Sequence, residues 1–381
     1  MQSKLFFVLS FFVVCSFLQN GIAQKSSILE LVQQQMAALP EHTEFSIGII
    51  ENGEITKMGF RIENGGIIPV KNADAIFEIG SITKTFTASL IMQAVGKGVM
   101  SLDDPLQKYL PVQMAKDNYE GHFITLQHLL MHTSGLESIP ASGNLPYLKA
   151  KIFSPKNPHQ YFKAKHYYKY LKKFKLDYIP GKIWDYNNSA YGLLGQITAD
   201  QNKTTWEKIT QENLFDPLSM TDSYFTINKK NEVRFVQGIS AKGKKAKAWE
   251  MDFINPAGVI KSTLNDMLKY AAAQLNPPTK ELAFLQAAHD PMSYEIKMPE
   301  GKLWDGNSMG LGWWHNLEQE GKTFIWHGGA SGGYTAFIGF SKEKNRAVVV
   351  LSNISSSHPD SRGENRIPKP MLLGQKLMRM E

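Results

Sequence analysis

Two pairs of strand-like segments, one near each end of the 381-residue chain, constrain its fold most strongly. In the first pair, apolar residues alternate over 45–49, Asn52-Gly53 forms a turn, and residues 55–60 return. An Asn-Gly step between alternating segments is typical of a β-hairpin. In the second pair, residues 335–340 and the apolar run 348–351 flank a short charged turn. We therefore expect one antiparallel sheet that is built from both ends of the chain.

Helical patterns fill much of the remaining chain. A capping-box pattern begins the helix expected over 28–37, and a last helix is expected over 370–380. Residues 106–220 carry mostly helical signals. The sequence thus predicts an α/β (α+β) fold flanked by helices. Its discontinuous sheet domain would cover 24–105 and 221–381, and a mostly helical domain would be inserted between the two parts.

The N-terminus has the three regions of a secretory signal peptide. Lys4 precedes an apolar run over 5–18, and the small residues Gly21 and Ala23 supply a cleavage site. The run is too short to cross a bilayer comfortably, and no later segment is long and apolar enough to do so. We therefore expect cleavage of residues 1–23 near Ala23 and export to a periplasm or to the medium.

The single cysteine of the chain, Cys15, lies inside this N-terminal segment. One cysteine forms no internal disulfide, and it excludes cysteine-based zinc sites and iron–sulfur clusters. Val13 and Val14 precede it where a lipoprotein signal has a small residue. A lipid anchor is therefore not expected.

The excess of positive charge is concentrated in one segment. There are 42 Lys and Arg residues against 35 Asp and Glu, and nine of the lysines fall within 147–175, where no acidic residue occurs. Tyr167, Tyr170, Leu171 and Phe174 recur there at helical spacing, so one helix face is apolar and the other is basic. The basic face either contacts an anionic polymer or a membrane, or it is the solvated outside of a packed helix. Nucleic acid is not an expected partner, because the rest of the exported chain is slightly acidic.

Ser81 and Lys84 are the first candidate catalytic pair. They stand three residues apart, where a strand-like segment meets an apolar helix. At this spacing both side chains lie on one helix face, and a lysine with a depressed pKa can take the proton of a serine. The pattern alone is weak evidence, because Ser341 and Lys344 repeat it on the charged turn.

Two further segments carry groups that suit acyl transfer. The loop 180–192 contains Tyr186 and Asn188 and opens a helix; a phenol shuttles protons where cations lower its pKa. A structural tyrosine beside an Asn turn is the alternative. Residues 326–334 place His327 among glycines before a strand, where the backbone leaves room for a substrate. The spacing of these glycines matches no phosphate-binding loop.

Together and in this order, the three segments resemble the serine β-lactamase and penicillin-binding-protein superfamily, and within it the class C β-lactamases. Residues 102–111, 124–136, 256–266 and 339–353 are similar to further segments of that family. The resemblance covers nearly all of the chain after the signal segment. It implies the class C β-lactamase and DD-peptidase-like fold.

The resemblance also implies a mechanism. Ser81 would attack a carbonyl carbon, with Lys84 and Tyr186 sharing the role of base. Asn188 would hold Lys84 and the substrate amide, and the backbone N–H groups of Ser81 and Ala330 would form an oxyanion hole. No metal or organic cofactor is implied. His128 and His132 stand four residues apart, but they lack the Glu and the third ligand of a zinc site, and the resemblance assigns His132 to a structural turn.

The third motif departs from the class C pattern. Those enzymes usually carry Lys-Thr-Gly, whereas this chain has His327-Gly328-Gly329, and the resemblance places His327 and Gly329 at the substrate. His-x-Gly is found in related D-peptidases and esterases. If His327 binds a carboxylate as the imidazolium, kcat/KM for anionic substrates falls as the pH rises through about 6–7. Arg362 or His358 is the alternative contact for the carboxylate.

Three functions are open at this point. The chain is an exported serine hydrolase that turns over β-lactams or D-amino acid amides and esters through an acyl-enzyme at Ser81. Alternatively, it is an esterase or a D,D-carboxypeptidase or endopeptidase that acts on peptidoglycan and is inhibited by β-lactams. The third function is a penicillin-binding sensor that acylates without turnover. Tyr186 and Asn188 argue against the sensor, because the groups needed for deacylation look complete.

Overall fold

The computed structural model of the protein describes residues 26–140, 145–153, 157–290, 307–316 and 324–380. The predicted signal segment, with Cys15, lies outside the described residues.

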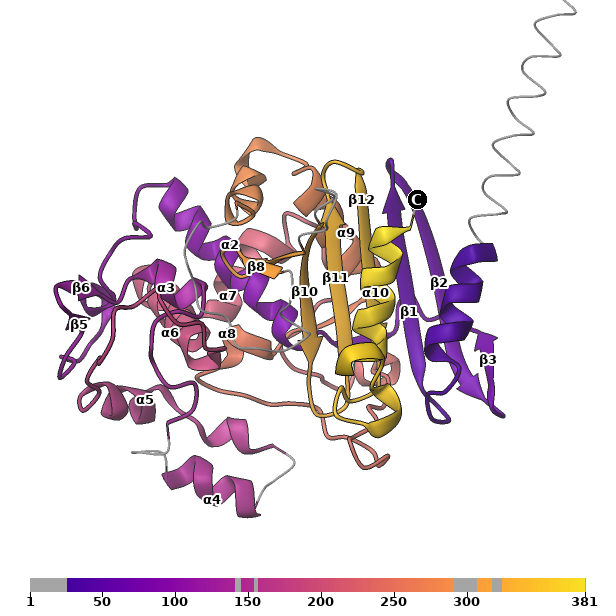
Figure 1. The fold of residues 1–381 in the computed structure, drawn as a ribbon, viewed down its shortest axis with the longest axis horizontal. Coiled ribbons are helices and arrows are strands. Elements are labelled where there is room, and N and C mark those ends of the chain that lie inside the picture. Colours follow the sequence, from indigo (N-terminus) through magenta and orange to yellow (C-terminus); the bar gives the residue numbers. More distant parts are fainter. Residues whose placement is uncertain (1–25, 141–144, 154–156, 291–306, 317–323, 381) are drawn as a thin grey trace, which may run out of the picture.

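Eight antiparallel strands form the main sheet in the order β3-β2-β1-β12-β11-β10-β9-β8 (Figure 1). Strand β1 pairs with β12 so that Ile47 lies opposite Val350, which joins the two ends of the chain in the middle of the sheet. The predicted antiparallel sheet built from both ends is therefore confirmed. The strands are β1 (Glu44–Glu51), β2 (Glu54–Glu63), β3 (Gly66–Pro69), β8 (Asn307–Met309), β9 (Trp314–Asn316), β10 (Phe324–Ala330), β11 (Thr335–Ser341) and β12 (Arg346–Ser352).

Both faces of this sheet are covered. On β12, Val348 and Val350 belong to one buried cluster, and Val349 and Leu351 belong to the other, as the alternation of a strand requires. The helix over residues 26–36 and α10 (Lys369–Arg379) cover the first face, and α9 (Leu264–Leu275) packs against the second (Figure 1). These first and last helices confirm the two predicted from the terminal sequence patterns.

Helices α3 to α7 lie to one side of the sheet (Figure 1). They fall within the segment 106–220 that the sequence predicts to be helical, although the two domain boundaries stay a prediction. Two-stranded pairs β4–β7 and β5–β6 complete the fold. The remaining elements are α3 (Leu126–Leu130), α4 (Leu145–Phe153), α5 (Ala164–Leu171), α6 (Asn188–Gln201), α7 (Trp206–Thr210), α8 (Asn255–Gly258), β4 (Ile76–Glu78), β5 (Asn118–Tyr119), β6 (His122–Phe123) and β7 (Lys261–Thr263).

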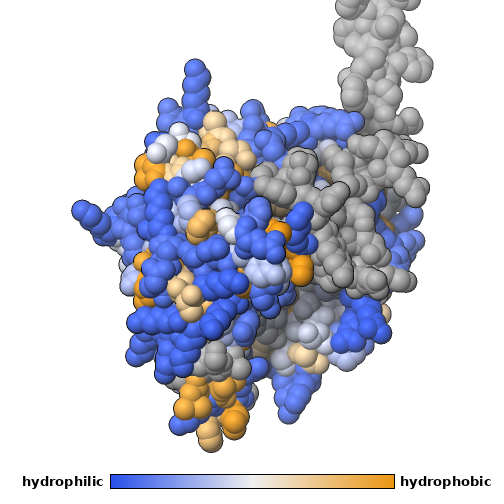
Figure 2. Space-filling model, turned by 60° about the vertical axis from the view of Figure 1, so that its left-hand side comes forward, coloured by the Kyte–Doolittle hydropathy of each residue, from blue (hydrophilic) through white to orange (hydrophobic). Residues whose placement is uncertain are grey.

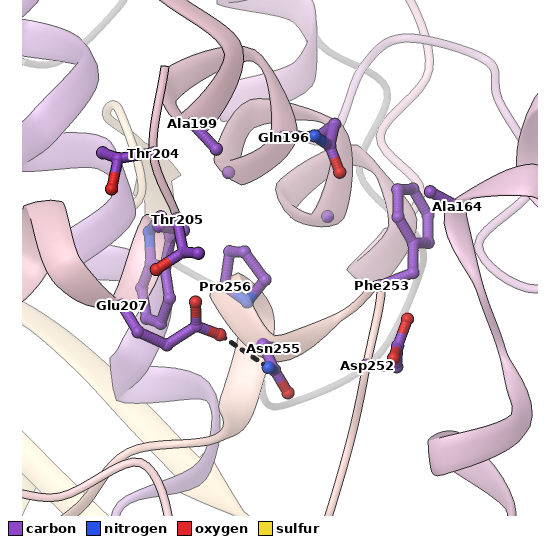
Figure 3. Close-up of a pocket in the computed structure, with 13 residues that line it drawn as sticks. Ala164, Gln196, Ala199, Thr204, Thr205, Glu207, Asp252, Phe253, Asn255 and Pro256 are labelled. Carbon is purple, nitrogen blue, oxygen red and sulfur yellow. Dashed lines mark hydrogen bonds between the residues drawn. The ribbon is translucent and has the colours of Figure 1, made fainter. Parts of the chain in front are cut away.

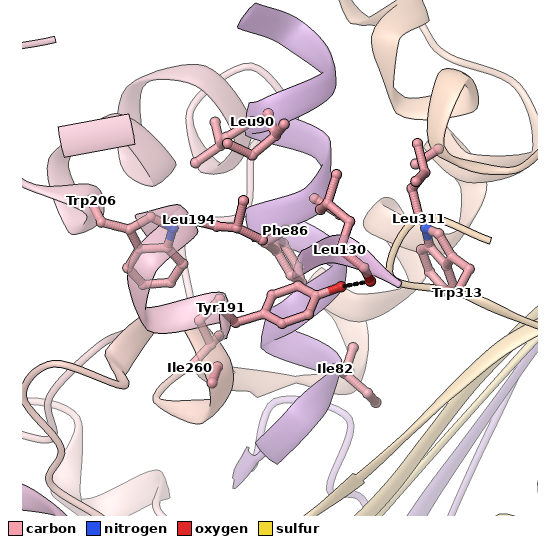
Figure 4. Close-up of a cluster of buried hydrophobic side chains, with 14 of the residues drawn as sticks. Ile82, Phe86, Leu90, Leu130, Tyr191, Leu194, Trp206, Ile260, Leu311 and Trp313 are labelled. Carbon is pink, nitrogen blue, oxygen red and sulfur yellow. Dashed lines mark hydrogen bonds between the residues drawn. The ribbon is translucent and has the colours of Figure 1, made fainter. Parts of the chain in front are cut away.

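The helix that follows Ser81, α2 (Thr83–Gly96), is buried on every side over its first ten residues. Its Phe86 stacks on Tyr270 with ring centroids 3.9 Å apart. Leu194 and Trp206 lie on one side of α2, and Trp313 lies on the other (Figure 4). A helix enclosed by close-packed apolar side chains holds the groups at its N-terminus in fixed positions. None of the described helices has the length and apolar character needed to span a bilayer.

Candidate active site

Ser81 lies where β4 leads into the buried helix α2. A short 3-10 turn, η1 (Gly80–Ile82), joins the two elements, and Ser81 is partly exposed on it. Lys84 stands one turn further on, with its Nζ 3.1 Å from the Ser81 Oγ. The two residues that the sequence pairs by spacing are therefore in hydrogen-bond contact.

The Lys84 amine is completely buried, and its surroundings determine how it can act. Burial lowers the pKa of Lys84 well below its usual value of 10.5. Its Nζ donates to the Asn188 Oδ1 and to the Ala257 carbonyl oxygen, both at 2.8 Å. Because these oxygens only accept hydrogen bonds, a neutral amine uses both of its N–H groups on them. The lone pair of the nitrogen is then left for the Ser81 hydroxyl, as a general base requires.

Tyr186 completes the polar group around Ser81. Its phenol hydrogen-bonds with Ser81, and burial raises the pKa of Tyr186 well above its usual value of 10. The Lys84 Nζ lies 4.7 Å from the centre of the Tyr186 ring. The sequence suggested that nearby cations would lower this pKa, but the effect of burial is larger. Tyr186 is therefore a neutral phenol at physiological pH.

His132 positions the loop that carries Tyr186. It is buried, and its ring centroid lies 4.5 Å from that of Tyr186. Its Nδ1 accepts the Asn187 backbone N–H at 3.1 Å, and its carbonyl oxygen accepts the Asp185 N–H at 2.8 Å. His132 thus bonds the residues on both sides of Tyr186. This is a structural role, as the resemblance implies for His132.

The second histidine of this pair, His128, is also engaged by the backbone. Its Nδ1 accepts the Thr125 N–H at 3.1 Å at the start of α3. Among the described residues, no group of three or more His, Cys, Asp or Glu side chains is arranged to hold a metal ion. That the reaction needs no metal or cofactor stays a prediction.

Ser138 is a residue of this site that the sequence did not reveal. Its Oγ accepts the backbone N–H of Asn188 at 3.0 Å, and its carbonyl oxygen accepts the Ser189 hydroxyl. These bonds fix the first turn of α6, from which Asn188 reaches Lys84. The one available signal was the place of Ser138, two residues after the family-like segment 124–136.

The end of β10 packs directly against the turn that carries Ser81. Gly80 has a φ of 50°, and a Cβ added to it would stand 2.6 Å from the backbone N and O of Ala330. A Cβ added to Gly329 would stand 1.9 Å from the Ile79 carbonyl oxygen. Both positions therefore require glycine, because the two backbones touch. This contact brings the Ala330 amide beside the Ser81 turn, where the resemblance places an oxyanion hole.

We expect Gly80→Ala to lower kcat/KM by about 10²–10³-fold, the loss typical for one misplaced oxyanion-hole donor. The added Cβ would push β10 away from the Ser81 turn. Gly53→Ala is the matched control, because Gly53 also has a positive φ (87°) but has nothing within 4 Å of an added Cβ. Steady-state rates of both variants test this, and wild-type kinetics for Gly80→Ala would refute the packing argument.

His327 is buried on β10 and is not a cation. Its Nδ1 lies 2.7 Å from the Gly328 carbonyl oxygen, which can only accept, so Nδ1 carries the proton and Nε2 is unprotonated. Burial lowers the pKa of His327 to about 3. The side chain is only 2 % exposed. The replacement for the family's lysine is thus a neutral imidazole.

Two buried ionisable side chains, Glu78 and Lys261, lie on the strand pair that leads to Ser81, and the sequence did not single them out. Glu78 and Lys261 face each other across the β4–β7 pair, and each is 2 % exposed. Burial raises the pKa of Glu78 and lowers that of Lys261. Glu78 accepts the Trp249 N–H at 2.6 Å, and the Lys261 Nζ donates to the Trp249 carbonyl oxygen at 2.7 Å. The two side chains therefore tie the strand pair before Ser81 to the backbone of Trp249.

The two residues that the sequence offered as substitutes for the missing lysine lie between β12 and α10. His358 accepts the Asp360 N–H with its Nδ1 at 3.2 Å, and Arg362 is exposed. A contact of either residue with a substrate carboxylate stays a prediction.

A cavity of about 270 Å³ lies between α6 and α8, away from Ser81 (Figure 3). Glu207 borders it, and the Asn255 Nδ2 donates to the Glu207 Oε1 at 2.7 Å. The two helices approach so closely that a Cβ added to Gly195 would stand 2.0 Å from the Pro256 ring. Helix α8 also carries Ala257, whose carbonyl oxygen accepts a hydrogen bond from Lys84. The close contact between α6 and α8 therefore helps to fix the position of the Lys84 amine.

The family of the chain follows from its sequence profile. The profile of the family described as Beta-lactamase matches residues 32–368. The chain belongs to the β-lactamase family. This family member is 25 % identical over 337 residues to the protein named flp of Staphylococcus aureus (strain MRSA252), a match that covers 86 % of this chain and 64 % of the relative. It is 24 % identical over 352 residues to a β-lactamase of Pseudomonas fluorescens, a match that covers 86 % of this chain and 92 % of that one.

The β-lactamase family member thus spans less than two thirds of the length of the staphylococcal relatives. Among solved structures, a protein described as a β-lactamase/D-alanine carboxypeptidase from Pseudomonas syringae matches with a TM-score of 0.73 at 20 % identity. The match covers 93 % of this chain and 99 % of that one. A structure described as a class C β-lactamase also matches, with a TM-score of 0.72 at 22 % identity over 94 % of this chain, and it confirms the class C β-lactamase-type fold expected from the three motifs. The sequence profile thus shows the family of the chain, and the solved structures show its fold.

Proposed function

We propose that this protein is an exported serine hydrolase that transfers an acyl group to Ser81 and releases it to water. The observation that carries this proposal is the bonding of Lys84. Its Nζ lies 2.8 Å from the Asn188 Oδ1 and from the Ala257 carbonyl oxygen and 3.1 Å from the Ser81 Oγ; in the neutral amine, the two N–H groups bond the first two oxygens and leave the lone pair for Ser81. A buried amine with a depressed pKa is a suitable base for a serine.

The pKa shifts favour Lys84 over Tyr186 as the acylation base. Burial favours the neutral form of both side chains: for Lys84 this is the basic amine, and for Tyr186 it is the phenol, which still carries its proton. The sequence left the choice between the two residues open. A neutral phenol that hydrogen-bonds with Ser81 is suited to donate a proton to the leaving group.

The proposed reaction has two stages. Ser81 Oγ bonds to the substrate carbonyl carbon while its proton passes to Lys84. The bond from that carbon to the leaving nitrogen or oxygen then breaks, and the leaving atom takes the proton by way of Tyr186. In the second stage, water adds to the acyl carbon while its proton passes to Lys84; the bond from that carbon to the Ser81 Oγ then breaks, and the Oγ takes the proton back. The amides of Ser81 and Ala330 would stabilise the oxyanion in both stages, at about 3–4 kcal/mol per donor.

β-Lactams are the first substrate class we propose, and amides or esters of D-amino acids are the second. The Pseudomonas fluorescens relative is named a β-lactamase, and the Pseudomonas syringae protein is described as both a β-lactamase and a D-alanine carboxypeptidase. The neutral His327 offers no cation for a substrate carboxylate, which β-lactams and D-Ala-D-Ala peptides both carry, so it favours amides and esters that lack one. Peptidoglycan stems would be the polymeric substrate if D-amino acid peptides are cleaved.

Initial rates on three substrates test the proposed function. Nitrocefin, a p-nitrophenyl ester and a peptide ending in D-Ala-D-Ala represent β-lactam, ester and D-peptide chemistry. We expect sustained turnover of at least one of them. A burst of one product equivalent followed by no turnover on all three would indicate the penicillin-binding sensor and would contradict the hydrolase.

The protonation of His327 gives a prediction about pH. Because its pKa is lowered to about 3, His327 stays neutral between pH 5 and 8, so no carboxylate contact should be lost across 6–7. We expect the ratio of kcat/KM for a carboxylate-bearing substrate to that for an uncharged ester to be constant over this range. Taking the ratio cancels the titration of Lys84, which affects both substrates. A ratio that falls as the pH rises through 6–7 would instead support an imidazolium that binds the carboxylate.

A further inference from the structure

Helix α4 presents apolar side chains to solvent on its outer face. Leu145, Leu148 and Ile152 follow the i, i+3, i+7 spacing of one helix face and are 60 %, 38 % and 72 % exposed. Phe153, at the end of the helix, is 80 % exposed. Figure 2 shows the resulting hydrophobic patch at the lower end of the molecule, where α4 lies in Figure 1. A protruding apolar face of this kind marks an interaction surface.

The opposite face of α4 is the one that packs on the protein. Tyr147 and Ala150 are buried, and the Tyr147 ring lies 5.6 Å from His159 and 5.9 Å from Phe162. The outer apolar residues are therefore not needed to attach the helix.

Exposed lysines occur on α4 and in the segment that follows it along the chain. Lys149 and Lys151 are exposed on α4 itself, and we call them, with Leu145, Leu148, Ile152 and Phe153, the basic apolar tip. Six more exposed lysines follow within 163–175, a stretch with no acidic residue. Within the described part of the chain, only Lys163 of these eight lysines forms an ion pair, with Asp252. The region therefore carries a largely uncompensated positive charge.

The apolar face of helix α5, unlike that of α4, is packed against the protein. The tyrosines that the sequence placed on the apolar face of α5 are buried: Tyr167 donates to the Glu137 carbonyl oxygen and Tyr170 accepts its N–H, both at 2.9 Å. Helix α5 thus matches the packed helix with a solvated basic face, one of the two alternatives drawn from the sequence. The apolar residues left without a partner are those of the neighbouring α4.

We propose that the basic apolar tip docks on the surface of an anionic lipid bilayer. Two contributions drive binding at a membrane interface: apolar side chains insert at the level of the headgroups, and lysines are attracted to anionic headgroups. The basic apolar tip offers both. A soluble anionic polysaccharide would satisfy the lysines but leave Ile152 and Phe153 in water. A second copy of the chain would cover the apolar face but would bring like charges together. Docking would hold the exported hydrolase at a membrane whose outer side faces its substrate.

Sedimentation with lipid vesicles tests this proposal on the chain as recovered from cells. We expect binding to vesicles of phosphatidylcholine with phosphatidylglycerol, weak binding to phosphatidylcholine alone, and weaker binding at high salt. The double variants Ile152→Ser with Phe153→Ser and Lys149→Gln with Lys151→Gln should each weaken binding at least about tenfold. All variants share one N-terminus, so any binding through residues 1–25 is the same in all of them.

Matched controls exist elsewhere on the surface. Ile55→Ser with Val233→Ser removes two apolar side chains that are 54 % and 88 % exposed, and Lys229→Gln with Lys230→Gln removes two exposed lysines. Neither control should change binding, and the tip variants should keep the wild-type kcat/KM on a small substrate.

Several outcomes would overturn the proposal. One is binding that the tip variants leave unchanged, and another is binding that depends on Lys149 and Lys151 but not on Ile152 and Phe153. Capture by dextran sulfate in preference to vesicles would indicate an anionic polymer. A concentration-dependent dimer that Ile152→Ser with Phe153→Ser abolishes, without vesicle binding, would indicate a second copy.

Discussion

Ser81→Ala is expected to lower kcat/KM at least about 10⁴-fold on every substrate that the wild-type protein turns over. The reason is chemical, because among the described residues no other hydroxyl hydrogen-bonds with the Lys84 Nζ. Loss of the Oγ leaves no enclosed gap, since Ser81 is partly exposed at the end of the buried helix. The variant should therefore fold normally, with a Tm close to that of the wild type.

Initial rates with nitrocefin and with a p-nitrophenyl ester measure this effect. Ser341→Ala is the matched control, because Ser341 begins the second Ser-x-x-Lys pattern but lies at the end of β11. We expect wild-type rates for Ser341→Ala. Near-wild-type rates for Ser81→Ala would remove Ser81 from the mechanism.

Lys84→Met should lower kcat/KM by about 10²–10⁴-fold, the usual contribution of a general base, and it should do so without loss of stability. Methionine fills a similar volume, and it needs no proton where burial penalises charge. A buried Lys84 cation lowers the free energy of unfolding. This loss of stability is absent above pH 10.5, and it is fully present below the lowered pKa of Lys84 in the folded state. Below pH 10.5, the free energy of unfolding of the wild type should therefore fall with decreasing pH by an amount that Lys84→Met removes.

Urea unfolding of both proteins at pH 6 and at pH 9.5 tests whether the stability changes with pH in this direction. We expect Lys84→Met to gain stability relative to the wild type at pH 6 and to gain less at pH 9.5. The lost hydrogen bonds to Asn188 and Ala257 reduce the gain equally at both pH values, so the difference between them reports the amine alone. A variant that is destabilised more at pH 6 than at pH 9.5 would show that the buried amine is held as a well-paired cation.

The parts of the fold that the sequence predicted correctly are those that local patterns determine. The Asn52-Gly53 hairpin and the apolar run over 348–351 are local signals, and together they indicated an antiparallel sheet built from both ends. The Ser81–Lys84 contact is local too, since i, i+3 spacing brings the two side chains together within one helix turn.

The parts that could not be predicted depend on tertiary packing. The Ala257 carbonyl that holds Lys84 lies 173 residues away in the chain, and a backbone oxygen leaves no trace in residue type. Likewise, Ser138 could not be distinguished from any loop serine before α6 was placed over it. The protonation of His327 depends on its burial on β10, whereas its identity alone suggested a group that titrates near neutral pH.

Intact-protein mass spectrometry over time, after mixing with a penicillin, tests the acyl-enzyme most directly. We expect a mass increase equal to one penicillin, located in the peptide that contains Ser81. This added mass should disappear as the product is released. Ser81→Ala should show no adduct at any time. An adduct that forms equally on Ser81→Ala, or turnover by the wild type with the adduct on another residue, would contradict an acyl-enzyme at Ser81.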